Sequence, residues 1–216
     1  MSKKRKNYQP LAHHFKNYEQ QASAGKLGVW LFLATEILMF GGLFVGYLIY
    51  KTEYADVFQA ASQFLDWKKG SINTVVLLFS SFTMAASIYY AQKDQMRKCQ
   101  GMLLVTIFCG LLFMFIKYIE YSHKIEMGIL PGKFFTYTGE GFVEGLPLYF
   151  SFYYLMTGLH ASHVIIGVFL MIAMLYKTFI NEIGPKHYMP LEYVGLFWHL
   201  VDLIWIYLFP LLYLVE

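Results

Sequence analysis

Charge and cysteine are both scarce in this sequence. Charged residues make up only 14% of its 216 residues, against about 25% in ordinary soluble domains, and this scarcity argues against a conventional water-soluble fold. The two cysteines, Cys99 and Cys109, do not form a CxxC pair. They therefore predict neither a disulfide framework nor a zinc site, and we expect both to be small packing residues.

The chain also lacks the motifs of soluble catalysis. It contains no phosphate-binding loop, no nucleophile elbow and no paired carboxylates of a hydrolase site. Its N-terminus is basic but has no apolar core followed by a small-residue cleavage site, so it does not read as a secretory signal peptide. Positive charge is not clustered elsewhere, so we expect no nucleic-acid partner.

Long apolar runs are what the sequence does have. Hydrophobic residues make up 57% of the chain and aromatic residues 19%, and the mean hydropathy is +0.45. A transmembrane helix needs about 20 apolar residues to cross the hydrocarbon. By this rule the sequence predicts an all-α, polytopic bundle (residues 26–216) after a basic N-terminal tail (1–25), with five transmembrane helices at about 26–51, 72–92, 99–122, 146–177 and 191–214.

Lysine and arginine in the short loops predict the orientation, because cytoplasmic loops carry an excess of these residues. If the N-terminus is inside, the inner segments hold eleven of them and the outer loops five. The inner set is Lys3, Lys4, Arg5, Lys6, Lys16, Lys26, Lys93, Arg97, Lys98, Lys177 and Lys186, and the outer set is Lys51, Lys68, Lys69, Lys124 and Lys133. We therefore expect a cytoplasmic N-terminus and a periplasmic C-terminus.

Ionisable residues inside the predicted spans are the main functional candidates. A charged side chain at a helix centre costs about 2.5–3.5 kcal/mol on insertion-based scales, so such residues are rarely present without a role. The candidates are Glu36, Lys117, Glu120, His160, His163, His199 and Asp202.

Glu36 has no basic residue three or four positions away, so any partner must come from another helix. It is either a proton-exchanging carboxyl or a neutral acid that forms a hydrogen bond between helices. Glu36, His160, His163 and Asp202 lie at a similar depth in their helices, and we expect them to meet inside the bundle.

The other candidates occur in pairs three residues apart. His160 and His163 share one predicted helical face, where they form a metal site, half of a haem-anchoring set, or a hydrogen-bonded helix contact. We expect His199 and Asp202 to form an ion pair within one helix. Lys117 and Glu120 are similarly spaced to neutralise each other near the outer face.

Five segments, taken in order, carry a family resemblance. They are LGVWLFLATEILMFGGLF, NTVVLLFSS, FIKYIEYSHKI, FYYLMTGLHASHVIIG and LFWHLVDLIWIYLFPLLY. Together they resemble subunit III of the haem-copper oxidases, that is, cytochrome c oxidase subunit III in its short bacterial five-helix form. The resemblance covers nearly the whole chain beyond the N-terminal tail.

The resemblance implies an accessory subunit of a proton-pumping aerobic terminal oxidase in the bacterial inner membrane. It implies that haem and copper belong to partner subunits, chiefly subunit I with subunit II, and that this chain has no cofactor, catalytic residue or metal ligand of its own. Its implied tasks are to support proton uptake, to stabilise the catalytic subunit and to bind structural phospholipid. Glu36 matches a buried glutamate of the family that reacts with a hydrophobic carbodiimide, and the family's other polar positions map to Glu120, His160, His163, His199 and Asp202.

One departure from the family pattern and three alternatives accompany this reading. The long form of the family has two further N-terminal helices that form a lipid-holding cleft, so here we expect that cleft to be absent or completed by a neighbouring subunit.

Subunits of quinol oxidases and nitric-oxide-reductase-associated proteins are similar, although a glutamate at position 36 favours cytochrome c oxidase. A haem-binding cytochrome b would use His160, His163 and His199, and a proton-coupled transporter would use Glu36 and Asp202, although no inverted repeat is evident.

Overall fold

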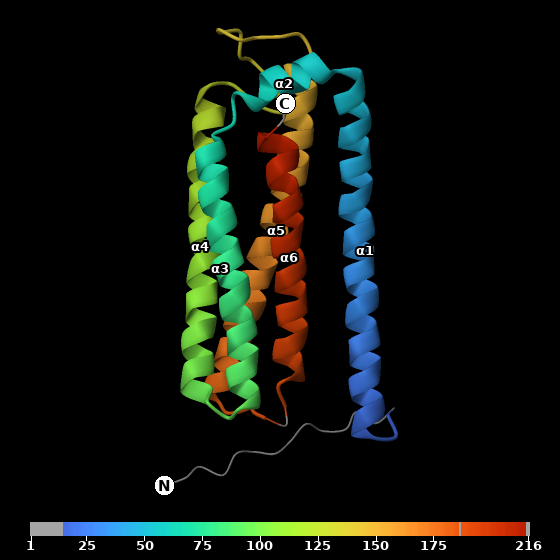
Figure 1. Cartoon of the computed structure of the whole chain (residues 1–216), viewed down its shortest axis with the longest axis vertical. Coiled ribbons are helices and arrows are strands. Elements are labelled where there is room, and N and C mark those ends of the chain that lie inside the picture. Colours follow the sequence, from blue (N-terminus) through green and yellow to red (C-terminus); the bar gives the residue numbers. More distant parts are fainter. Residues whose placement is uncertain (1–14, 186, 215–216) are drawn as a thin grey trace.

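The computed structural model describes residues 15–185 and 187–214 (Figure 1). Within these residues the chain forms six α-helices and one short 3₁₀ turn, and no strand. The elements are α1 (Tyr18–Glu53), α2 (Ala55–Ser62), α3 (Trp67–Gln92), α4 (Met96–Glu126), η1 (Gly132–Phe134), α5 (Leu146–Phe179) and α6 (Met189–Tyr213). Most of the predicted N-terminal tail (residues 1–14) lies outside the described residues, as does Lys186.

Five of the described helices, α1 and α3 to α6, are long and apolar enough to cross a membrane. This confirms the predicted all-α fold with five spans. The five helices run side by side along the long axis of the molecule (Figure 1), so α1 begins at one end of the bundle and α6 finishes at the other. The cytoplasmic location of the N-terminus stays a prediction.

The helices extend beyond several of the predicted apolar runs because polar residues cap them. Asn17 Oδ1 accepts a hydrogen bond from the Gln20 amide at 2.8 Å, so α1 begins eight residues before the predicted start at position 26. Asp66 likewise accepts hydrogen bonds from the first-turn amides of α3. Side-chain caps satisfy amides that have no partner inside the helix, and a count of apolar residues does not detect them.

Helix α2 is an element that the sequence analysis missed. It lies across the end of the bundle where α1 finishes (Figure 1), and it buries Phe58 and Ala61. The Phe58 ring lies 5.1 Å from that of Tyr47 and 5.2 Å from that of Tyr149, measured between centroids. Apolar residues three and four positions apart are the signal of such a short amphipathic helix.

Helices α3 to α6 pack together, and α1 stands to one side of them, against α5 and α6 (Figure 1). Of the most apolar window of each helix, 56% is buried in α6 but only 11% in α1. Helix α6 is therefore the central helix of the bundle, whereas most of the α1 surface faces outward.

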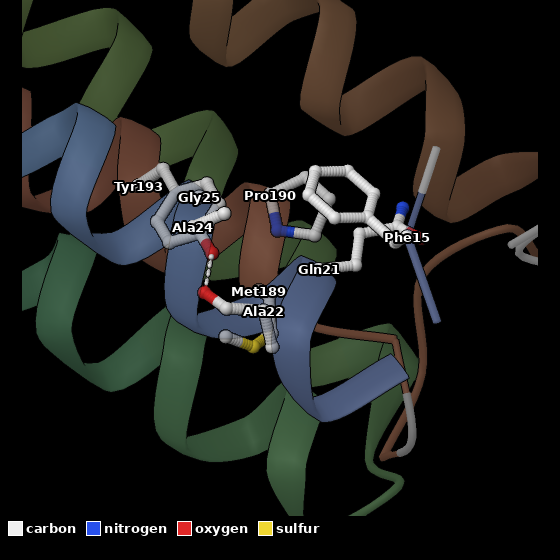
Figure 2. Close-up of a pocket in the computed structure, with 8 residues that line it drawn as sticks. All are labelled: Phe15, Gln21, Ala22, Ala24, Gly25, Met189, Pro190 and Tyr193. Atoms are coloured by element: carbon white, nitrogen blue, oxygen red, sulfur yellow. Dashed lines mark hydrogen bonds between the residues drawn. The ribbon is translucent and has the colours of Figure 1, made fainter. Parts of the chain in front are cut away.

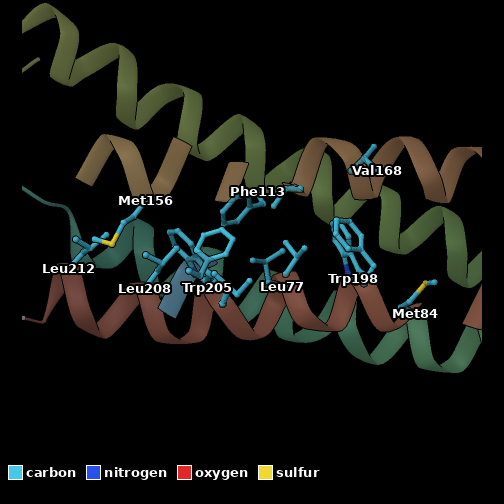
Figure 3. Packing of buried hydrophobic residues seen from close by; sticks show 14 of the residues in the cluster. Leu77, Met84, Phe113, Met156, Val168, Trp198, Trp205, Leu208 and Leu212 are labelled. Carbon is cyan, nitrogen blue, oxygen red and sulfur yellow. The ribbon is translucent and has the colours of Figure 1, made fainter. Parts of the chain in front are cut away.

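Two tryptophans of α6 form the centre of the core (Figure 3). Trp198 Nε1 donates to Ser80 Oγ and Trp205 Nε1 donates to Thr74 Oγ1, both at 3.0 Å. Both indole N–H groups thus find acceptors on α3, as buried tryptophans require. Gly167 on α5 leaves room for the Trp198 ring: a Cβ atom at this glycine would lie 2.7 Å from Trp198 Cε3.

We expect Gly167→Ala to destabilise the fold by about 1–3 kcal/mol, because the added methyl group overpacks the site next to Trp198. Gly158→Ala, on the same helix, is the matched control, since a Cβ atom there meets nothing within 4 Å. The control should leave the unfolding free energy unchanged or raise it by up to about 1 kcal/mol through helix propensity. Denaturant unfolding in mild detergent measures both, and equal effects would contradict the packing described.

Candidate functional site

Glu36 of α1 and His163 of α5 form a polar contact between two helices. The distance from His163 Nε2 to Glu36 Oε2 is 2.9 Å. The other ring nitrogen, Nδ1, lies 2.8 Å from the Leu159 carbonyl oxygen. The partner of Glu36 therefore comes from another helix, as the sequence predicts.

This geometry determines the charge of the pair. A carbonyl oxygen only accepts hydrogen bonds, so His163 Nδ1 carries a hydrogen and donates it to Leu159. The Nε2–Oε2 contact then holds one hydrogen, which belongs either to the imidazole or to the carboxyl group. In both arrangements the net charge of Glu36 and His163 together is zero, and a net-neutral pair is the form least penalised in a membrane.

The pair lies between aromatic rings and beside a cleft. The His163 ring is 5.4 Å from the Phe40 ring and 6.2 Å from the Phe197 ring, measured between centroids. The side chains of His163 and Glu36 are 11% and 14% exposed, so some of their surface remains open. Both residues line a cleft of about 350 Å³ between α1, α5 and α6.

Two further hydrogen bonds attach α1 to α6. Tyr193 Oη donates to the Ala22 carbonyl oxygen at 3.3 Å near the beginning of α1, and Figure 2 shows this bond at a second cavity. Tyr47 Oη donates to the Leu211 carbonyl oxygen at 2.8 Å near the far end. With the Glu36–His163 contact in the middle, α1 is held to the bundle at three levels.

A second polar cluster, the Lys117 cluster, joins α4 to α5 and α6. Its members are Lys117, Glu120, Lys124, Tyr153 and Tyr213. Lys117 Nζ donates to Glu120 Oε2 at 3.0 Å, to Tyr153 Oη at 3.2 Å and to Tyr213 Oη at 2.8 Å. Glu120 Oε1 accepts from Lys124 Nζ at 2.8 Å, from Tyr153 at 2.9 Å and from Tyr213 at 2.7 Å. All five side chains are buried, and every described polar group of Glu120 has a partner.

The sequence predicts the Lys117–Glu120 pair correctly, but it misplaces Lys124. The sequence predicts that Lys124 lies in an outer loop. It lies instead in α4, which continues to Glu126, and it is buried one turn after Glu120. The cluster thus holds two ammonium groups and one carboxylate. Four aromatic rings surround Lys117 Nζ at 5.2–5.4 Å, and their negative faces offset part of the excess positive charge.

His160 does not join His163, contrary to the expectation that the two share one face. The His160 ring packs 5.4 Å from the Phe113 ring and 5.3 Å from the Trp205 ring, and neither ring nitrogen has a hydrogen bond within the described chain. Residues three apart differ in direction by about 60° around a helix axis. In α5 this difference directs His163 toward α1 and His160 toward α4 and α6.

His199 and Asp202 do not pair with each other, so the predicted ion pair within α6 is wrong. His199 Nδ1 instead contacts Ser81 Oγ of α3 at 2.6 Å. Asp202 is buried, and neither carboxyl oxygen has a hydrogen-bond partner among the described residues. The hydroxyls of Ser80 and Ser81 lie beside it, but Ser80 donates to the Leu77 carbonyl oxygen and Ser81 contacts His199.

The sequence predicts that Glu36, His160, His163 and Asp202 meet inside the bundle. In the structure these groups lie between different pairs of helices, and only Glu36 and His163 contact each other. Within residues 15–185 and 187–214, no group of three or more His, Cys, Asp or Glu side chains is arranged to hold a metal ion. The separate partners of His160, His163 and His199 give no support to the cytochrome b alternative.

We expect Glu120→Gln to destabilise the protein by about 3 kcal/mol or more, because it leaves two buried ammonium groups without their anion. Glu126→Gln is the matched control, since Glu126 is exposed near the end of the same helix and should change the unfolding free energy by less than about 0.5 kcal/mol. Denaturant unfolding of the two variants in mild detergent tests this. If Glu120→Gln is as stable as the control, Glu120 does not neutralise the cluster.

The sequence of this chain matches a known protein family over most of its length. The family described as cytochrome c oxidase subunit III matches residues 12–216 of this chain. A probable quinol oxidase subunit 3 of Staphylococcus haemolyticus is 27% identical over 197 residues, which cover 90% of each protein. The protein of the same name from Staphylococcus saprophyticus is 26% identical over 210 residues, or 95% of this chain and 97% of the relative. The chain therefore belongs to the cytochrome c oxidase subunit III family of the haem-copper oxidases.

Proposed function

We propose that this chain is a non-redox accessory subunit of a proton-pumping aerobic terminal oxidase. In this proposal the partner subunits hold haem and copper and reduce oxygen to water. The family match over residues 12–216 is the observation that carries the proposal. The geometry supports it because Glu36 and the Lys117–Glu120–Lys124 cluster bond to side chains of other helices in the same chain.

The electron donor of the complex is, in this proposal, a quinol. On the sequence alone, the glutamate at position 36 favours cytochrome c as the electron donor. The relatives reported above carry the name quinol oxidase subunit 3 and align with 90% or more of the chain, which supports the quinol alternative better than the first expectation.

The proposed contribution of this chain is mechanical and local. The Glu36–His163 pair and the Lys117 cluster hold the five helices in one arrangement, and this arrangement presents a constant surface to the catalytic subunit. Subunit I is the proposed main partner, with subunit II and structural phospholipid as further contacts in a bacterial inner membrane. A fixed surface of this kind supports the proton-uptake side of subunit I and protects it from inactivation during turnover.

Removing this chain from the purified oxidase should leave the initial rate of quinol oxidation largely intact. It should reduce the number of turnovers before inactivation, and proton uptake should slow during these turnovers, because the partner surface loses its support. Oxygen consumption and stopped-flow proton uptake, each measured with and without the chain, provide the test. Unchanged lifetime together with unchanged proton uptake would contradict the supporting role.

The same purified oxidase preparations identify the electron donor of the complex. The complete oxidase should consume oxygen with a soluble quinol analogue and should not do so with reduced cytochrome c. The opposite preference would return the assignment to cytochrome c oxidase without affecting the accessory role.

A further inference from the structure

The cleft between α1, α5 and α6 has the composition of a ligand site. Its volume of about 350 Å³ falls within the range of roughly 300–1,000 Å³ seen for small-molecule pockets, which are mostly apolar with a few polar groups. Its wall is formed by Val29, Phe32, Glu36, His163, Ile166, Leu170, Tyr193, Val194 and Phe197.

One polar atom of the cleft wall remains available to a ligand. Both ring nitrogens of His163 are engaged, with Glu36 and with the Leu159 carbonyl oxygen. Glu36 uses Oε2 for this contact, and its Oε1 has no hydrogen bond within the described chain. Glu36 Oε1 is therefore an acceptor for a hydroxyl group that enters the cleft.

The depth of this acceptor limits the chemistry of the ligand. Glu36 lies midway along α1, which places it near the bilayer centre, about 15 Å of hydrocarbon from either interface. A phospholipid headgroup does not reach this depth because it would lose its hydration. A small ligand that brings a hydroxyl group to Glu36 must therefore itself be soluble in hydrocarbon.

The aromatic residues of the cleft restrict the chemical class of the ligand further. Phe32 of α1 and Phe197 of α6 line it with ring centroids 6.0 Å apart, a separation typical of aromatic contacts. A cleft wall that holds flat apolar rings and one acceptor suits a hydroxylated aromatic ring. A saturated acyl chain would gain only dispersion contacts and would leave Glu36 Oε1 without a donor.

We propose that this cleft binds a lipid-soluble hydroquinone, with one ring hydroxyl donating to Glu36 Oε1. The second cavity, of about 410 Å³, lies toward the beginning of α1 and shares Tyr193 with the cleft (Figure 2). The proposal concerns binding on this subunit and goes beyond the proposed function, since it holds whichever donor the complex oxidises.

Photolabelling of the intact oxidase complex tests this binding. The probe is an azido-substituted hydroquinone with a short alkyl chain, and labelled peptides are mapped by mass spectrometry. We expect the label on α1 together with α5 or α6, at residues of the cleft. Excess unlabelled decyl-hydroquinone should displace the probe, whereas excess dioleoylphosphatidylglycerol should not.

Two variants of cleft residues and one control variant locate the site. Leu170→Trp fills the cleft and should reduce labelling of these helices at least about tenfold, by analogy with loss of a well-packed pocket. Leu38→Trp is the matched control, because Leu38 is 74% exposed on α1 and does not line the cleft; it should label like the unmodified protein. Glu36→Gln replaces a charged or acid acceptor by an amide and should weaken binding by up to about tenfold.

Three results would overturn the proposal. The first is labelling of this chain only outside the cleft, and the second is labelling that Leu170→Trp does not reduce. The third is displacement of the probe by phosphatidylglycerol as effectively as by decyl-hydroquinone, which would show that the cleft binds acyl chains. Photolabelling needs no turnover. A complex that oxidises cytochrome c but still labels in the cleft would therefore contradict the proposed donor and leave this site intact.

Discussion

Neutral pairing of ionisable groups across helix seams is the constraint on which the rest of this structure depends. Hydrocarbon penalises an isolated charge, and the Glu36–His163 contact avoids this penalty because one shared hydrogen leaves the pair without net charge. The contact is the middle of three attachments of α1. Together with the ring contacts of Tyr47 to Tyr149 and Phe152, it holds against α5 a helix whose apolar window is only 11% buried.

The Lys117 cluster limits the same penalty at the other side of the bundle: Glu120 neutralises one of the two buried ammonium groups, and hydroxyls of α5 and α6 bond to the charges. Its tyrosines accept from Lys117 and donate to Glu120, so each hydroxyl serves both charges at once. A buried network in which each side chain is bonded to the others favours one helix arrangement. In the proposed role as an accessory subunit, this constant arrangement of helices is what the chain contributes to the complex.

Sequence reasoning identified the five spans and the need for an interhelical partner of Glu36, because apolar length and i±4 spacing are local properties. It did not distinguish His163 from His160, since that choice depends on the rotation of α5 about its axis. It missed Lys124 in the cluster, although the four-residue spacing from Glu120 was a usable signal. Tyr153 and Tyr213 gave no signal, because their role exists only once α4, α5 and α6 are packed.

A double-mutant cycle on Glu36→Ala and His163→Ala tests the central claim most directly. The free energy of unfolding in mild detergent is measured for the unmodified protein, both single variants and the double variant. If the two side chains form one neutral pair, their coupling energy should be about 1–3 kcal/mol, within the range of directly contacting residues. Additive effects, with a coupling energy near zero, would show that the two groups act independently and would contradict the account.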